Sequence, residues 1–161
     1  MTDVPDTPPP DPRAEVIYRE SVRALDLQSA SVDELRARTG VLLAAASVAT
    51  AFLGAEAFKL HGFWWVNVLA AIVFVGVVLL ALFILMPKGG WEFTYNADVL
   101  QQYYLTEKKA TLTQMYLSMA TGHAESRLSN KKLLDCRMEV FAYACGALGL
   151  DVVLWLIGIR A

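Results

Sequence analysis

The sequence has little of what enzymes and nucleic-acid-binding proteins use. Its 161 residues include two histidines and two cysteines, and none of the short motifs of nucleophilic serines, zinc sites or phosphate-binding loops occurs. The formal net charge is −2 and the basic residues form no long run, which argues against nucleic-acid binding. Cys136 and Cys145 are nine positions apart, about 13 Å along one helix, so we predict free thiols. We therefore expect no enzymatic activity, no cofactor and no bound metal.

What the sequence does have is one long segment that is apolar on every face. Residues 63–86 carry no charged side chain, and Asn67 is the only amide among them. As a helix the segment is about 36 Å long, slightly more than a hydrocarbon core of about 30 Å. A core helix of a small soluble protein would keep a polar stripe for water. This segment predicts a transmembrane helix.

Residues 41–60 and 140–159 are two further membrane segments, and both are rich in small side chains at four-residue spacing. Small residues at that spacing let another helix approach closely, which is how helices associate in lipid. The residues predicted to serve this packing are Ser47, Thr50, Ala51, Gly54, Ala55, Ala142, Gly146 and Gly149. Only His61 and Gly62 separate the first two spans, so we expect these spans to form a tight antiparallel hairpin.

Asp151 lies near the middle of the third span. A carboxylate at the bilayer centre costs about 2.5 to 3.5 kcal/mol on insertion scales, so it should face other helices or water rather than lipid. One interpretation is a proton-titrating or pore-lining group. The other is a neutral acid bonded to a neighbouring helix, for which Asn67, Thr50, Ser47 and Tyr143 are the available partners.

Glu56 is the second acid inside a span. Counted from the ends of their helices at the same side of the membrane, Glu56 and Asp151 lie about 22 Å and about 17 Å along, so the two could share one layer. The alternative places Glu56 at the outer headgroups, beside Lys59 three residues on.

The polar segments are predicted to lie outside the bilayer, as one disordered tail and two helical regions. Residues 1–12 contain five prolines and predict a disordered tail. Residues 13–40 predict a cytosolic helical segment, in which Ser31 and Glu34 have the form of a capping box and indicate a fresh helix start. Residues 87–138 predict a second cytosolic helical region with a turn at Gly122 and His123, and we expect no ligand role for this lone histidine.

One apolar stripe in the 87–138 region needs a partner. Leu112, Met115, Tyr116 and Met119 recur at the spacing of a helix face. The candidate partners are the helix over 13–27, the second half of the same region, or another copy of the protein. The neighbouring pair Lys131 and Lys132 could add a surface for an anionic ligand or lipid headgroups, or supply ordinary positive charge beside the membrane.

The distribution of basic residues sets the expected orientation. In a three-span arrangement twelve of the fourteen Lys and Arg residues fall on one side. The positive-inside rule then places the N-terminus and the 87–138 region in the cytosol, and the C-terminus outside. We expect a multi-pass protein of the plasma (inner) membrane.

A family resemblance accompanies this layout. The run Asp33-Glu34-Leu35-Arg36-Ala37-Arg38-Thr39-Gly40-Val41-Leu42-Leu43, the tight hairpin, the exit Met86-Pro87-Lys88 and the third span resemble the Pycsar-effector-like transmembrane proteins. The related two-span SLATT effectors of bacterial antiphage systems look similar. The resemblance covers residues 31–159. It implies a plasma-membrane protein that oligomerises and impairs the membrane when infection is sensed, through a cyclic-nucleotide signal in family members.

Together these observations predict an all-α membrane protein. It has three transmembrane helices, a tight hairpin plus a C-terminal span, with a cytosolic helical segment between spans 2 and 3. The first functional hypothesis is an oligomerising, membrane-disrupting effector of antiphage defence that is triggered through its cytosolic helices. The alternative is a non-catalytic scaffold or phage-exclusion protein that binds a cytosolic partner protein through those helices.

Overall fold

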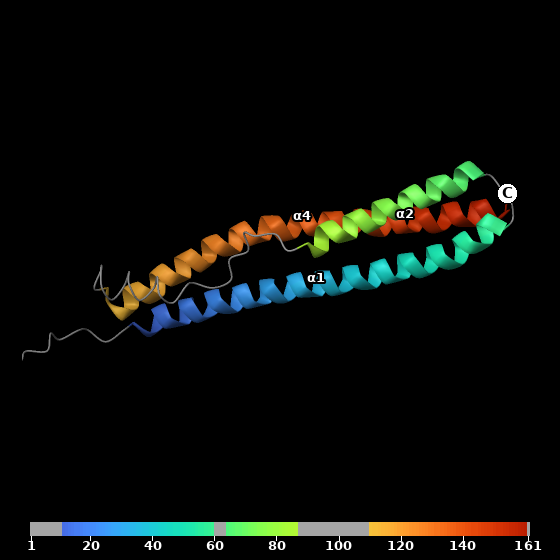
Figure 1. Cartoon of the computed structure of the whole chain (residues 1–161). Helices are drawn as coiled ribbons and strands as arrows, with labels where there is room; N and C mark the ends of the chain where they lie inside the picture. The colour runs from blue at the N-terminus through green and yellow to red at the C-terminus, as the bar shows by residue number, and fades with distance from the viewer. Residues whose placement is uncertain (1–10, 60–63, 87–109, 161) are drawn as a thin grey trace, which may run out of the picture. The chain divides into compact units, whose positions relative to one another are not determined.

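The structure is a computed structural model and describes residues 11–59, 64–86 and 110–160. These residues form three helices and no strand: α1 (Pro12–Lys59), α2 (Trp64–Leu85) and α4 (Leu112–Arg160) (Figure 1). Each helix contains a stretch long and apolar enough to cross a membrane. The all-helical class and the three candidate spans are therefore confirmed. The predictions for residues 1–10, for the hairpin turn and for residues 87–109 lie outside the described residues.

The N-terminal end of α1 is set by Asp11 and Pro12. The backbone N–H of Arg13 donates to Asp11 Oδ1 at 2.9 Å, and that of Ala14 donates to the Asp11 carbonyl at 3.0 Å. Aspartate is a good N-cap, and proline suits the first helical position because its missing N–H would have no partner there. Pro12 thus belongs to the helix rather than to the predicted tail.

The helix start predicted at Ser31 is wrong, because α1 runs without a break from Pro12 to Lys59. Ser31 Oγ donates to the Leu27 carbonyl one turn back at 2.9 Å, as serine does inside a helix. Glu34 pairs instead with Arg38 at 2.5 Å. The segments 13–40 and 41–60 are therefore parts of one helix.

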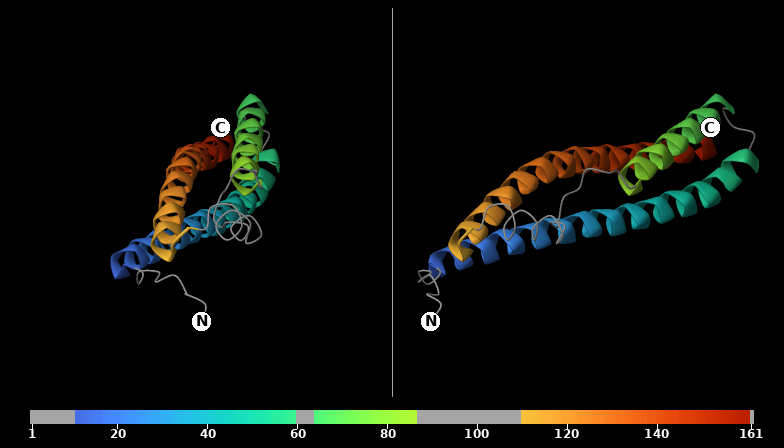
Figure 2. Two further views of the ribbon diagram at one scale, coloured as in Figure 1. Left: turned by 90° about the vertical axis from the view of Figure 1, so that its left-hand side faces the viewer. Right: turned by 60° about the vertical axis from the view of Figure 1, so that its left-hand side comes forward.

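The turn predicted at Gly122 and His123 is also wrong, because both residues lie inside α4. The capping box of this helix is at Thr111 and Gln114. The Thr111 N–H donates to Gln114 Oε1 at 3.1 Å, and the Gln114 N–H donates to Thr111 Oγ1 at 3.4 Å. A glycine inside a helix costs about 1 kcal/mol, which the packing of the next residue, buried His123, helps to offset. Figure 2 shows α1 and α4 as continuous helices.

The chain divides into two compact units. Among the described residues, the first unit holds 11–31 and 110–132, and the second holds 32–59, 64–86 and 133–160. In the first unit the Asp11 N–H donates to Thr113 Oγ1 at 3.0 Å. In the second unit Thr50 contacts Asp151. The sequence separations are 102 and 101 residues, so within each unit α1 and α4 lie side by side and parallel.

The buried residues of α1 and α4 follow a repeat of seven. On α1 buried side chains alternate at spacings of three and four, which is typical of helices packed in a left-handed supercoil. These residues are Leu25, Gln28, Val32, Leu35, Thr39, Leu42 and Ala46. On α4 the buried residues at steps of seven are His123, Asn130, Arg137, Ala144 and Asp151. Four of these five are polar, so the innermost line of α4 is a row of polar side chains.

In the second unit α2 packs through small residues. Ala46, Val77 and Ala144 lie in one buried cluster, and Ala57 and Ala70 lie in another with Trp155. The opposite side of α2 exposes large apolar side chains, among them Ile72, Val75 and Leu79. Such a surface suits lipid, in which apolar side chains need no cover.

Candidate functional site

Asp151 and Thr50 form the central polar contact of the second unit. Thr50 Oγ1 donates to Asp151 Oδ2 at 3.0 Å, and the aspartate side chain is fully buried. Asp151 Oδ1 and Trp155 Nε1, one helical turn apart, have no hydrogen-bond partner among the described residues. Of the two interpretations of Asp151, this geometry matches the bond to a neighbouring helix, with Thr50 as the partner.

Gly54 is the point of closest approach beside this contact. A Cβ atom placed on Gly54 would lie 3.3 Å from Cη2 of Trp155, tighter than an ordinary contact. Trp155 is 1% exposed, and its ring meets Phe58 edge to face at 6.0 Å between centroids. The indole thus fills the space between α1 and α4 that the missing side chain of Gly54 leaves.

The eight residues predicted to serve helix packing fall into two groups. Thr50 and Gly54 make the contacts inside the unit. The remaining six face outward, and they are Ser47, Ala51, Ala55, Ala142, Gly146 and Gly149. The small residues therefore provide one internal seam and further exposed faces on α1 and α4.

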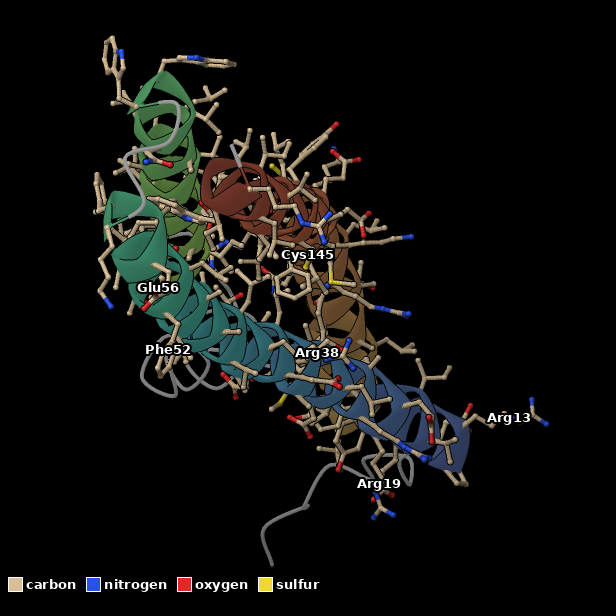
Figure 3. The ribbon with its side chains drawn as sticks, turned by 90° about the vertical axis from the view of Figure 1, so that its right-hand side faces the viewer. Arg13, Arg19, Arg38, Phe52, Glu56 and Cys145 are labelled. Atoms are coloured by element: carbon tan, nitrogen blue, oxygen red, sulfur yellow. The ribbon has the colours of Figure 1, made fainter. Side chains whose placement is uncertain are left out.

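Glu56 lies away from Asp151. Its carboxylate pairs with Lys59 Nζ at 2.7 Å, and the glutamate side chain is 58% exposed. Figure 3 shows Glu56 on α1, near the exposed ring of Phe52. The two intramembrane acids thus have separate surroundings, and Glu56 takes the arrangement with Lys59 that we had considered as the alternative.

Asn67 lies where all three helices meet. Its Nδ2 donates to the Ala57 carbonyl of α1 at 3.5 Å, while its Oδ1 has no partner among the described residues. A Cβ atom on Gly158 of α4 would collide with Asn67 Oδ1. Asn67 therefore ties the N-terminal end of α2 to α1, and a side chain at position 158 would displace its amide.

Arg137 is a buried residue whose role the sequence did not reveal. It is 4% exposed, and its guanidinium donates to the carbonyls of Ile84 at 3.1 Å and Met86 at 3.2 Å. The last carbonyls of a helix have no partner within the helix, and a cation is favourable at that end. Burial, and then the nearby Arg36 guanidinium, lowers the pKa of Arg137, but an arginine remains charged in proteins. Arg137 thus caps the C-terminal end of α2.

In the first unit the predicted apolar stripe packs on α1. The ring of Tyr116 stacks on that of Tyr18 at 5.4 Å, Met119 is 7% exposed and Met115 is half-buried. Leu112 is exposed. Of the three partners considered for the stripe, the helix over 13–27 supplies the ring that stacks on Tyr116.

His123 continues this packing on the next turn of α4. Its ring is 7% exposed, its Nδ1 lies 3.2 Å from Ser21 Oγ, and its centroid is 5.7 Å from that of Tyr18. Burial lowers the pKa of His123. A histidine that we expected in a loop is therefore part of the contact between α1 and α4.

A groove of about 540 Å³ lies beside this contact. Glu20 and Ala24 line it from α1, and Arg127, Leu128 and Lys131 line it from α4. The surface that lines the groove is mostly apolar, and its charged residues are Glu20, Arg127 and Lys131. Lys132 is exposed and does not line the groove.

The described residues contain no group of three or more histidine, cysteine, aspartate or glutamate side chains that could hold a metal ion. Cys136 and Cys145 are free and exposed on α4, and Figure 3 marks Cys145. Comparisons of the chain with protein-family models, with curated proteins and with solved structures found no match.

Proposed function

We propose that this chain is an oligomerising membrane effector. In this proposal it assembles with copies of itself in the inner membrane and permeabilises the bilayer when its cytosolic helices receive a signal. The biological setting, defence of a bacterium against phage, comes from the resemblance of residues 31–159 to small antiphage effectors. The proposal assigns no catalytic role to any residue.

The observation that carries the proposal is the outward direction of the small residues. Ala51 on α1 and Gly146 and Gly149 on α4 are exposed, and a Cβ atom on either glycine would meet nothing within 4 Å. A bundle that works alone in lipid gains nothing from small residues on its outer surface. Helices of another copy gain close contact there, which is the main source of helix association in a membrane.

The cytosolic input is assigned to the first unit. The positive-inside rule places residues 110–132 and the N-terminal part of α1 in the cytosol. Since α1 and α4 each continue from the first unit into the second, a signal that alters their pairing at Tyr18 and Tyr116 has a direct path to the spans. A cyclic nucleotide, the signal that the resemblance implies, or a cytosolic protein is the proposed trigger.

The scaffold alternative is less well supported. It needs the stripe of Leu112, Met115, Tyr116 and Met119 to face a partner protein, and of these four Leu112 is exposed. Met119 is buried, and Tyr116 stacks on Tyr18. Because this stripe already serves the pairing of α1 with α4, we favour the effector.

The test is membrane depolarisation in cells that express the full chain. A voltage-sensitive dye should report depolarisation with the parent chain and a loss of that signal with Gly146→Leu combined with Gly149→Leu, because leucines keep a neighbouring helix at a distance. Ala71→Leu is the control: it places a leucine at an exposed position of α2 and should depolarise like the parent. Equal depolarisation by all three chains at equal membrane abundance would refute the proposal.

The orientation has a separate test. In a chain with Cys136 and Cys145 replaced by serine, a cysteine introduced at Arg160 should react with an impermeant maleimide from outside the inner membrane. A cysteine introduced at Ser129 should react only after that membrane is opened. The reverse pattern would overturn the assigned orientation.

A further inference from the structure

The groove of the first unit has unequal charge on its two walls. On the α1 wall Glu20 has only a long contact of 3.8 Å to Arg23, with both side chains more than half exposed. On the α4 wall Arg127 and Lys131 form no ion pair with any residue that the structure describes. One wall thus offers an acid whose exposed pair contributes little, and the other offers two cations that pair with no acid among the described residues.

The groove is also apolar where it meets water. Leu128 is 65% exposed although it belongs to the unit that we place in the cytosol, and Ala24 of α1 and Ala124 of α4 add two apolar side chains to the lining of the groove. In the described part of this unit two helical segments pack only on each other. Two helices leave apolar faces uncovered, and bundles of four are the common way to cover them.

We propose that a second copy of this chain closes this groove and makes a parallel four-helix bundle. Copies inserted in one bilayer share the same chain direction, so the two-fold axis that relates them runs along the helices. Such an axis places α1 of each copy against α4 of the other. Glu20 of one copy then faces Arg127 and Lys131 of the second copy, and the same contact occurs twice, as a two-fold interface requires. This inference rests on the proposed function only in taking the copies to assemble in one membrane.

The register of the helices identifies which residues should meet. Ser21 contacts His123, and Gln28 Nε2 donates to the Arg127 carbonyl at 3.2 Å. Between these two contacts, Ala24 lies level with Ala124. In the four-helix bundle Ala24 of one copy therefore approaches Ala124 of the second copy.

Disulfide crosslinking between two differently tagged copies tests this arrangement. Both copies carry Cys136→Ser and Cys145→Ser; one adds Ala24→Cys and the other adds Ala124→Cys. We expect oxidation in native membranes to give a product that holds both tags. Because each copy has a single cysteine, no bond within one copy can form that product.

The control pair is Asp26→Cys with Ser129→Cys. These exposed positions lie about 200° and about 140° around their helices from Ala24 and Ala124, so they should give no doubly tagged product. Charge reversal adds a second control. Glu20→Lys should lower the crosslinked yield of the groove pair about fivefold, because like charges then face each other across the interface. Adding Arg127→Glu to the same chain should restore the yield.

Three results would overturn the inference. The first is an equal yield from the groove pair and the control pair. The second is no doubly tagged product while both groove cysteines react with maleimide, which would show the groove open to solvent. The third is the absence of a doubly tagged product when both groove cysteines are also protected from maleimide in the detergent-solubilised monomer. That result would show that another segment of the same chain covers the groove. Depolarisation that still depends on Gly146 alongside any of these results would leave the proposed function standing.

Discussion

Replacing Arg137 should destabilise the second unit more than the loss of any exposed charge. Its guanidinium makes two hydrogen bonds, at 3.1 and 3.2 Å, to the carbonyls of Ile84 and Met86. A hydrogen bond to a charged group contributes about 1.5 to 3 kcal/mol, and the buried Ile84 carbonyl, left without a donor, adds its desolvation cost. Water at the membrane edge can replace part of this, so we expect Arg137→Ala to cost about 3 kcal/mol in the free energy of unfolding.

Arg137→Lys should recover roughly half of that loss, because an ammonium acts as a point charge and lacks the planar fork that reaches two acceptors. The free energy of unfolding is measured in bicelles by steric trapping, with Lys132→Ala as the control. Lys132 is exposed, and its replacement should change stability by no more than about 0.5 kcal/mol. If Arg137→Ala costs no more than Lys132→Ala, the assignment of Arg137 as the cap of α2 is wrong.

Three further predictions concern single contacts. His123 is held below its usual pKa by burial, so the pairing that it supports should be intact above about pH 6.5 and weaken as the pH falls toward the lowered pKa, since the unfolded chain takes up the proton first. The protection factors of the amides of residues 12–31, which correct for the intrinsic pH dependence of hydrogen exchange, measure this at pH 7.5 and 5.5. His123→Gln should reduce the difference between the protection factors at the two pH values. The same difference in the variant and the parent would count against the prediction. Gly158→Ala should gain about 1 kcal/mol in helix propensity, but its Cβ displaces Asn67, so we expect a net gain smaller than that; with Asn67→Ala in the same chain the full gain should appear. A double-mutant cycle with no coupling would contradict this contact. Thr50→Val should cost about 0.6 kcal/mol, and at most about 1.7, in the parent chain and nothing in an Asp151→Leu chain; equal costs in both chains would show that the bond to Asp151 contributes nothing.

The spans were predictable because lipid imposes a simple rule on sequence. A helix that crosses a bilayer must be apolar over its whole length, so residues 63–86 could be assigned before any neighbour was known, and α2 occupies Trp64–Leu85. The same reasoning explains why Asp151 was recognised as an inward-facing residue. An acid within an apolar span has few acceptable surroundings.

The two misplaced helix boundaries have a common cause. Ser31 and the pair Gly122 and His123 carry local signals for a helix start or a turn, and those signals contribute about 1 kcal/mol each. Both sites lie within long helices whose neighbouring residues are buried against another helix, such as Val32 beside Ser31 and His123 itself. Tertiary packing outweighs a local preference of that size. A prediction made from each segment separately does not include this packing energy.

The sequence by itself determined that the chain has three helical segments long and apolar enough to cross a membrane. It also determined that an acid within one of them should face other helices rather than lipid. It did so because the bilayer acts on each helix separately, through length and hydropathy alone. Only the tertiary structure decided which residues meet. Residues of α1 contact residues of α4 that lie about a hundred positions later in the sequence. Nothing local in the sequence encodes this alignment of the two helices. This alignment brings Thr50 to Asp151 and Gly54 to the ring of Trp155. The tertiary structure also places Arg137 at the C-terminal end of α2.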